Sequence, residues 1–186
     1  MPSRTPWNRK NAVKKKKNRI EIETSQLARA PMHVEGDVDG PAVFELDGDP
    51  VARPAGPIRY DLTAELVGGG EVVVSGSAEA PFELLCGRCA RFFSTIVKKS
   101  AFLRAYEWND HPETLDATAD VREDLLREIP GYPLCRPDCK GLCPQCGRDL
   151  NEGDCGCAPP EEAADVGPWA ALDGWNETDA GDGGRK

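Results

Sequence analysis

The chain has 186 residues, which allows one modest domain with appendages, and its hydrophobic content of 39% is low for a globular protein. Its net charge of −9 is unevenly distributed, because residues 1–19 carry eight Lys and Arg and no acidic residue, so the remainder is strongly acidic. No apolar run approaches the roughly 18 residues that span a membrane, and no secretory signal follows the basic start. We therefore expect neither a membrane nor a secreted protein, and the cytoplasm is the expected compartment.

The basic head comes first along the chain. Residues 1–19 are expected to form a disordered tail, because their like charges repel one another and little apolar surface is available for folding. Trp7 offers a ring that can stack on a base. The alternative is a tail that only keeps the protein in solution. The candidate contacts to RNA phosphates are Lys14, Lys15, Lys16, Lys17 and Arg19.

Alternating apolar and polar residues predict strands over much of the chain up to residue 106. The alternation is clearest at 58–67, which is typical of a half-buried strand. The succession of hairpins predicts a mainly β (α+β) fold, in which an antiparallel sheet curls or closes into a small barrel. The expected strands are 20–23, short stretches in 32–48, 58–67, 71–85 with a bend near Pro81, and 92–106 as one strand or two; 49–57 is a loop and 68–70 a turn.

One helix is expected, at 119–129. Asp120 is its predicted N-cap, since Glu123 follows three residues later with the spacing of a capping box. An apolar stripe along Val121, Leu125 and Ile129 would face the sheet.

The chain is expected to divide into four segments. Residues 1–19 form the tail, 20–130 a β-rich domain ending in the helix, and 131–157 a cysteine-rich zinc-knuckle module packed on that domain. Residues 158–186 form an acidic tail, in which the PWAALDGW patch suits a short helix.

Eight cysteines in four close pairs are the strongest chemical signal. Two pairs supply the four thiolates of a tetrahedral site, the geometry that Zn²⁺ prefers. A reduced cytoplasmic compartment favours metal binding over disulfides, which are the alternative. The pairs are Cys86 with Cys89, Cys135 with Cys139, Cys143 with Cys146, and Cys155 with Cys157.

The knuckle CPQCG suggests how the pairs combine. Pro144 and Gly147 favour a tight turn whose backbone amides point at the sulfurs. Eight residues between Cys146 and Cys155 allow a small hairpin that closes one site. By elimination the remaining four cysteines form the other site, although other combinations of the pairs stay open.

Two structural Zn²⁺ ions are therefore the expected cofactors, because eight thiolates leave no coordination position open for catalysis. Spacing alone does not separate zinc from iron. Arg88 and Arg148 are among the cationic neighbours that would moderate the charge of the sites, and solvated surface is the alternative for them.

Catalytic motifs are lacking from the sequence. There is no P-loop, dinucleotide-binding glycine pattern or nucleophile elbow, and His33 and His111 are expected to be ordinary surface residues. We therefore expect no enzyme, no catalytic residue and no small-molecule substrate.

The segments LLCGRCARFF and DLLREIPGYPLCRPDCKGLCPQCGRDLNEGDCGC resemble the YceD family, the large ribosomal RNA subunit accumulation proteins. The resemblance implies a cytoplasmic bacterial protein or an organellar relative, needed for accumulation or processing of large-subunit ribosomal RNA in ribosome biogenesis. It supplies no catalytic residue. Some members of the family lack the GLCPxCG and CxC cluster, which implies that this cluster is accessory.

The expected partners are a ribosomal RNA precursor, contacted by the tail, or a basic ribosomal protein or processing factor, suited to the acidic body. Two alternatives remain: a zinc-dependent protein adaptor without RNA binding, and an enzyme acting as a nuclease or a thiol redox catalyst.

Overall fold

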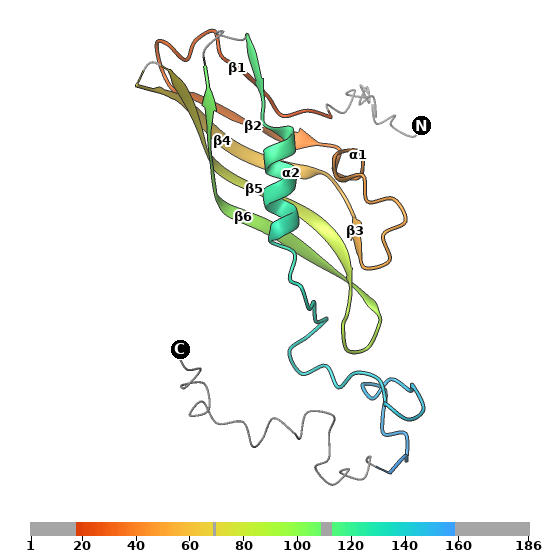
Figure 1. Cartoon of the computed structure of the whole chain (residues 1–186). Helices are drawn as coiled ribbons and strands as arrows, with labels where there is room; N and C mark the ends of the chain where they lie inside the picture. Colours follow the sequence, from red (N-terminus) through yellow and green to blue (C-terminus); the bar gives the residue numbers. More distant parts are fainter. Residues whose placement is uncertain (1–17, 69, 109–112, 159–186) are drawn as a thin grey trace, which may run out of the picture. The chain divides into compact units, whose positions relative to one another are not determined.

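The computed structural model describes residues 18–68, 70–108 and 113–158 (Figure 1). It divides into two compact units, the first extending to Gly141 and the second beginning at Leu142. The helices and strands of the described residues lie in the first unit. No helix in this part of the chain is long and apolar enough to cross a membrane.

An antiparallel sheet of five strands forms the first unit. β5 (Glu71–Leu85) is central, and β6 (Phe92–Glu107) pairs with its whole length on one side. On the other side β4 (Ile58–Val67) pairs with the first part of β5 and β3 (Ala52–Pro54) with the last part. β2 (Met32–Val38) pairs with β4 at the edge, and a separate pair joins β1 (Glu21–Glu23) to β7 (Thr114–Asp116).

The mainly β fold and the curled antiparallel sheet are confirmed, but closure into a barrel is wrong. Among the described residues the sheet stays open, because β2, β3 and β6 are each paired on one side only. Closure would need β2 to pair with β6 as well as with β4, and the pairings of the described strands do not include that pair. For residues 92–106 the sequence predicted either one strand or two, and the structure has one long strand, β6.

A β-bulge between Gly76 and Ala78 bends the two central strands. Gly76 has φ +148°, and a Cβ at this position would lie 2.1 Å from the carbonyl oxygen of Asp61. Only glycine fits this close approach of two backbones. Beyond the bulge the alternation holds, so the even-numbered residues of β5 from Val72 to Leu84 face the core.

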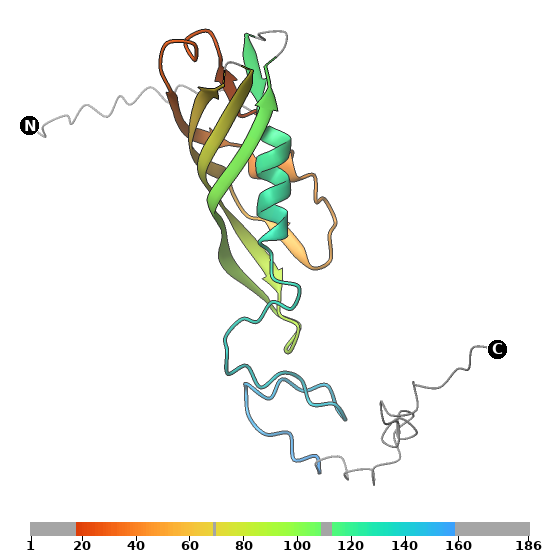
Figure 2. The same cartoon turned by 60° about the vertical axis from the view of Figure 1, so that its left-hand side comes forward.

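Two helices cover the core face of the sheet (Figure 2). The expected helix is confirmed as α2 (Thr118–Arg127), with Val121 and Leu125 buried. The predicted Asp120 cap is wrong, since Asp116 accepts the Thr118 N–H at 2.9 Å and Asp120 lies inside the first turn.

The short helix α1 (Gly40–Phe44) was not expected, and a proline in its first turn fixes the backbone for helix entry. Its last residue, Phe44, meets Phe82 of β5 edge to face at 4.8 Å between ring centroids.

Ion pairs join α2 to β6. Asp124 of α2 is only 4% exposed and accepts a hydrogen bond from Arg104, while Lys99 Nζ lies 3.9 Å from its other oxygen. Lys99 also donates to Glu128 at 3.0 Å. A buried carboxylate is tolerated only with such partners, so this seam fixes how the helix lies on the sheet.

Candidate metal centre

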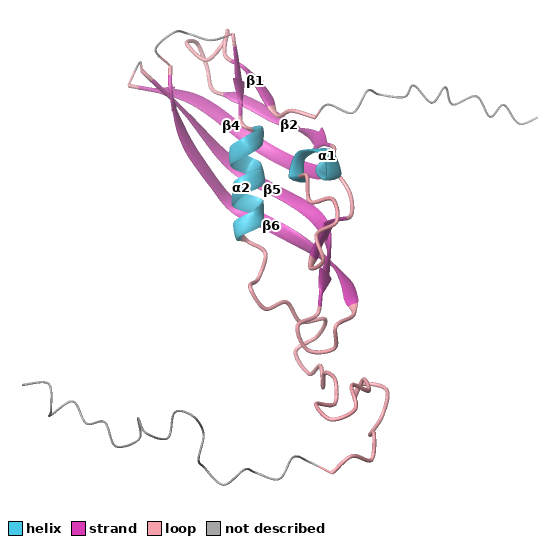
Figure 3. Cartoon of the chain, turned by 45° about the vertical axis from the view of Figure 1, so that its right-hand side comes forward, coloured by secondary structure: helices cyan, strands magenta, loops and turns pink. Residues whose placement is uncertain are grey.

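The first cysteine quartet joins a strand turn to the loop after α2. Cys86 and Cys89 lie in the turn between β5 and β6, and Cys135 and Cys139 follow the helix in a segment that Figure 3 shows as loop. The turn is closed by the Ala90 N–H, which donates to the Cys86 carbonyl at 3.0 Å, and Ala90 adopts φ +53°. This left-handed conformation costs a non-glycine residue about 1 kcal/mol, so the turn is held in shape by its surroundings.

The four sulfurs of this quartet have the spacing of a tetrahedron. The Sγ atoms of Cys86 and Cys139 are 3.9 Å apart, those of Cys89 and Cys135 are 3.8 Å apart, and all four lie within 4.8 Å of one another. A Zn–S bond of about 2.3 Å places tetrahedral sulfurs about 3.8 Å apart. The cysteines are free thiols, far from the roughly 2 Å of a disulfide. The donor set therefore fits a zinc ion.

Hydrogen bonds around the quartet hold its two halves together. The Cys135 N–H donates to Cys86 Sγ at 3.4 Å, and Arg88 donates to the Cys139 carbonyl at 2.9 Å. The Tyr132 hydroxyl donates to the Gly87 carbonyl at 3.0 Å. Outer contacts of this kind fix the ligands of a metal site before the metal arrives.

Acidities in the first quartet are shifted in opposite directions. Burial acts to raise the pKa of the Cys86 thiol, but hydrogen bonds from the backbone N–H groups of Cys89, Cys135 and Arg88 outweigh it and lower this pKa to about 6. Burial, followed by the neighbouring thiols, raises the pKa of Cys135 to about 12. The backbone N–H groups thus favour the thiolate of Cys86, and a cation among the sulfurs would favour that of Cys135 as well.

The second quartet lies within the second unit and is built by local turns. Cys143, Cys146, Cys155 and Cys157 have sulfurs within 4.8 Å of one another. The Gly147 N–H donates to the Cys143 carbonyl at 2.8 Å, and Gly147 takes φ +72°, as its place in the knuckle requires.

Exposure and acidity in the second quartet differ between its members. Cys143 is buried, Cys155 and Cys157 are half-buried, and Cys146 is exposed. The backbone N–H groups of Cys146 and then Gln145 lower the pKa of Cys143 to about 6, while the thiol of Cys146, then that of Cys155, raises the pKa of Cys157 to about 12. As in the first quartet, one thiol has a lowered pKa and another a raised pKa, but the cysteines of the second quartet are less buried.

The structure brings all eight predicted cysteines together, in the two groups expected from the knuckle. That these groups hold metal stays a prediction. Lys14, Lys15, Lys16 and Lys17 lie outside the described residues, as does His111. Arg19 is exposed, with its Nε 3.9 Å from Asp116.

Sequence reasoning missed several contacts. Arg88 holds the backbone of the first quartet, a role that its position beside a cysteine does not reveal. A Cβ at Gly87 would lie 2.5 Å from the Tyr132 ring, so this glycine makes room for the ring. His33 lies on the surface as expected, but its Nε2 is 2.8 Å from Asp61 Oδ1. One side-chain ligand atom from each of His33, Asp61 and Glu35 lies within 4.8 Å of the others. Cross-strand register made this group, and single-strand patterns do not show it.

Comparisons with known proteins agree with the motif. The family described as large ribosomal RNA subunit accumulation protein YceD matches residues 74–174, more than half of the chain and a range that contains every cysteine. Uncharacterized proteins of Mycobacterium tuberculosis and Mycobacterium bovis are each 30% identical over 151 residues, 70% of this chain and 70% of theirs.

A plant relative carries the family name. The large ribosomal RNA subunit accumulation protein YCED homolog 1, chloroplastic, of Arabidopsis thaliana is 32% identical over 72 residues, 36% of this chain and 22% of its own length. No solved structure matches the chain. On the family match, this chain belongs to the YceD family of large ribosomal RNA subunit accumulation proteins.

Proposed function

We propose that this protein is a cytoplasmic, non-catalytic factor in ribosome biogenesis, needed for the accumulation or processing of large-subunit ribosomal RNA. The observation that carries the proposal is the family match over residues 74–174, which includes both cysteine quartets. The spacing of the sulfurs supports two structural zinc ions.

A structural role for the metals follows from the donor count. Four cysteines complete a tetrahedral zinc site, whereas catalytic zinc keeps one position for water or substrate. Zinc held in this way supplies folding energy and leaves the ion no place for a substrate. The first quartet would fasten the turn between β5 and β6 to the loop after α2.

The charge distribution supports a chaperone-like mechanism with two contacts. The basic residues Lys14 to Lys17, with Arg19, would neutralise phosphates of a ribosomal RNA precursor and release counterions. The acidic body would hold a basic ribosomal protein or processing factor. The protein would thereby keep precursor RNA and a protein partner together during assembly.

The test is depletion of the protein in its own cells. We expect a fall in the ratio of large-subunit to small-subunit ribosomal RNA, rescue by the wild-type gene, and sedimentation of the tagged protein with precursors of the large subunit on a sucrose gradient. A normal ratio, with the protein at the top of the gradient and no crosslink to precursor RNA, would overturn the proposal.

Removal of residues 1–19 separates this function from a protein adaptor that does not bind RNA. We expect the truncated protein to lose its crosslinks to precursor RNA while keeping its protein partner. An RNA-independent adaptor would rescue depleted cells equally well without these residues.

A further inference from the structure

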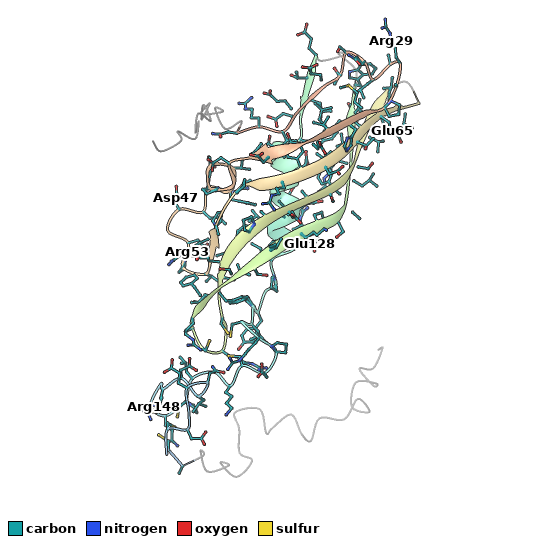
Figure 4. The ribbon with its side chains drawn as sticks, turned by 180° about the vertical axis from the view of Figure 1, so that it is seen from behind. Arg29, Asp47, Arg53, Glu65, Glu128 and Arg148 are labelled. Carbon is teal, nitrogen blue, oxygen red and sulfur yellow. The ribbon has the colours of Figure 1, made fainter. Side chains whose placement is uncertain are left out.

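The two faces of the five-stranded sheet differ in character. α1 and α2 lie on the core face, and no described segment of the first unit covers the opposite face (Figure 4, seen from behind). We name the opposite side the outer face; it is formed by the odd-numbered residues of β2, β4 and β5 and by their cross-strand partners on β6. Figure 4 shows Glu65 near one end of it and Arg53 near the other.

Two large apolar side chains of β6 are exposed on the outer face, with Lys98 between them. Leu103 and Ile96 are each 62% exposed, unusually high for large apolar side chains. The register places Leu103 beside Ser75 and Ile96 beside Pro81. Leu103 and Ile96 therefore stand in solvent as two separate apolar contacts, one on each side of the bulge.

Carboxylates of β2, β4, β5 and β6 lie on the same face, and one of them, Asp61, is 2.8 Å from His33 Nε2. Cross-strand pairs set Glu35 opposite Asp61, Glu65 opposite Val73 and Glu71 opposite Glu107. Like charges that lie side by side raise the negative potential of the face, which favours a cationic partner.

Two of the three cations of β6 are directed to the core face, and the third, Lys98, lies on the outer face opposite Glu79. Lys99 and Arg104 reach Asp124 of α2, with Lys99 also donating to Glu128. Among the described residues of the outer face, the cations are Arg53, Arg59 and Lys98. Of these, Arg59 lies 3.5 Å from Glu79 and Arg53 stacks 4.0 Å above the Phe92 ring. The sheet therefore separates its charges, with positive side chains used at the helix seam and negative ones presented outward.

We infer that the outer face docks a basic segment of a protein partner, whose apolar side chains cover Leu103 and Ile96 while its Lys and Arg side chains meet the surrounding carboxylates. This inference rests on the proposed function, in which the acidic body holds a basic protein.

Charge and shape disfavour the other occupants. RNA is repelled by the carboxylates, and Phe92, the aromatic residue that the described part of this face presents, is already covered by Arg53. A second copy of the chain would set the same carboxylates against each other. The hollow beside the bulge, lined by Asp61, Glu79 and Lys98 among others, has about 190 Å³, below the size of sites for small ligands and suited to a single side chain.

The test uses a photo-crosslinking amino acid at Leu103 in the full chain, with the same group at Asp47 as a matched control, since Asp47 is an exposed loop position away from this face. The probes are RNA-free proteins extracted from purified large ribosomal subunits, and separately a large-subunit precursor transcript, both at physiological salt. We expect Leu103 to crosslink to a particular basic protein, with a yield about tenfold or more above that from Asp47.

Charge-reversal variants test the electrostatic part. We expect Glu65→Lys to weaken binding of the crosslinked protein by about tenfold. Asp47→Lys, which changes the net charge equally at an exposed loop position away from this face, should leave binding unchanged. Circular dichroism and metal content confirm that both variants fold.

The outcomes separate this inference from the proposed function. Crosslinks from Leu103 to the transcript alone, to a second copy, or to basic proteins no better than from Asp47 overturn the docking face, while a fall in large-subunit RNA on depletion keeps the proposed function. Equal effects of Glu65→Lys and Asp47→Lys also overturn it, because the attraction would then be unspecific. Normal levels of large-subunit RNA in depleted cells overturn the proposed function, and with it the docking inference that rests on it.

Discussion

The two cysteine quartets share one chemistry and differ in what they connect. The first draws its ligands from residues 86 to 139, so it fastens the end of the sheet to the chain beyond α2, and three of its cysteines are buried. The second draws all four ligands from residues 143 to 157 and closes on its own turns, with Cys146 exposed. Because closing a long loop costs more chain entropy than closing a short one, the same ion would contribute differently to stability at the two sites. The number and type of the ligands do not show which part of the fold a metal site stabilises. The distance along the sequence between the ligands, and their burial, show it.

Single serine substitutions sharpen this contrast and have the largest expected effect. Cys86→Ser should remove one zinc ion and lower the free energy of unfolding of the first unit by about 4 kcal/mol or more, since folding and binding are coupled there. Cys146→Ser should also remove one ion but change the unfolding of the sheet by less than about 1 kcal/mol. Elemental analysis and urea unfolding followed by circular dichroism measure both; equal destabilisation by the two variants would contradict the contrast.

Chelation separates the sites by rate. We expect a chelator to take zinc from the intact protein in two phases, because the exposed second quartet releases its ion without opening the sheet, whereas the buried first quartet requires local unfolding. A colorimetric zinc indicator follows the release, and the fast phase should vanish in Cys146→Ser. A single phase, or loss of the slow phase in that variant, would show that burial does not control release.

Two glycines offer a matched pair of smaller perturbations. Gly141 and Gly147 have φ of +79° and +72°, so alanine strains both backbones similarly, by about 1 kcal/mol. Only at Gly141 does the new Cβ meet other atoms, at 3.0 Å from the Arg88 carbonyl oxygen, whereas Gly147 has open space within 4 Å.

Gly141→Ala should therefore weaken zinc binding of the first quartet more than Gly147→Ala weakens that of the second, by about 1 kcal/mol more. Competition with a chelator of known affinity measures each loss. Equal losses of zinc affinity in the two variants would mean that the Arg88 backbone moves away from the new Cβ without loss of stability.

Sequence patterns predicted the elements whose causes are local. Period-two alternation at 58–67 and 71–85, the apolar stripe of the helix and the paired cysteines each follow from residues close together in the chain. The open sheet edge, the bulge at Gly76 and the bond from Arg88 to Cys139 depend on which distant segments meet. The Asp120 cap failed for a local reason: Asp116, two residues before Thr118, accepts the Thr118 N–H, while Asp120 lies inside the helix and accepts from the Tyr106 hydroxyl of β6 at 2.7 Å.

Loss of the hydrogen bond from Tyr106 to Asp120 is expected to have the smallest effect on stability, and both residues lie in the first unit. Burial, then the hydrogen bond to Asp120, raises the pKa of Tyr106 above its usual value near 10, with Asp116 also raising it and Arg104 opposing. A raised pKa in the folded state means that the contribution to stability is complete below pH 10 and is lost as the pH rises further.

Tyr106→Phe should thus lower the free energy of unfolding by about 1 kcal/mol at pH 7, the value of one hydrogen bond. Above pH 10 the wild type should lose up to about 1.4 kcal/mol per pH unit relative to the variant, so the two stabilities should converge. Urea unfolding from pH 7 to 11 measures this, with zinc content as the control, because both ions should stay bound in the variant at neutral pH. A gap that widened with pH would show that the tyrosine ionises more easily in the folded sheet than in the unfolded chain, and a loss of zinc would show that the helix seam and the first quartet fold as one cooperative piece.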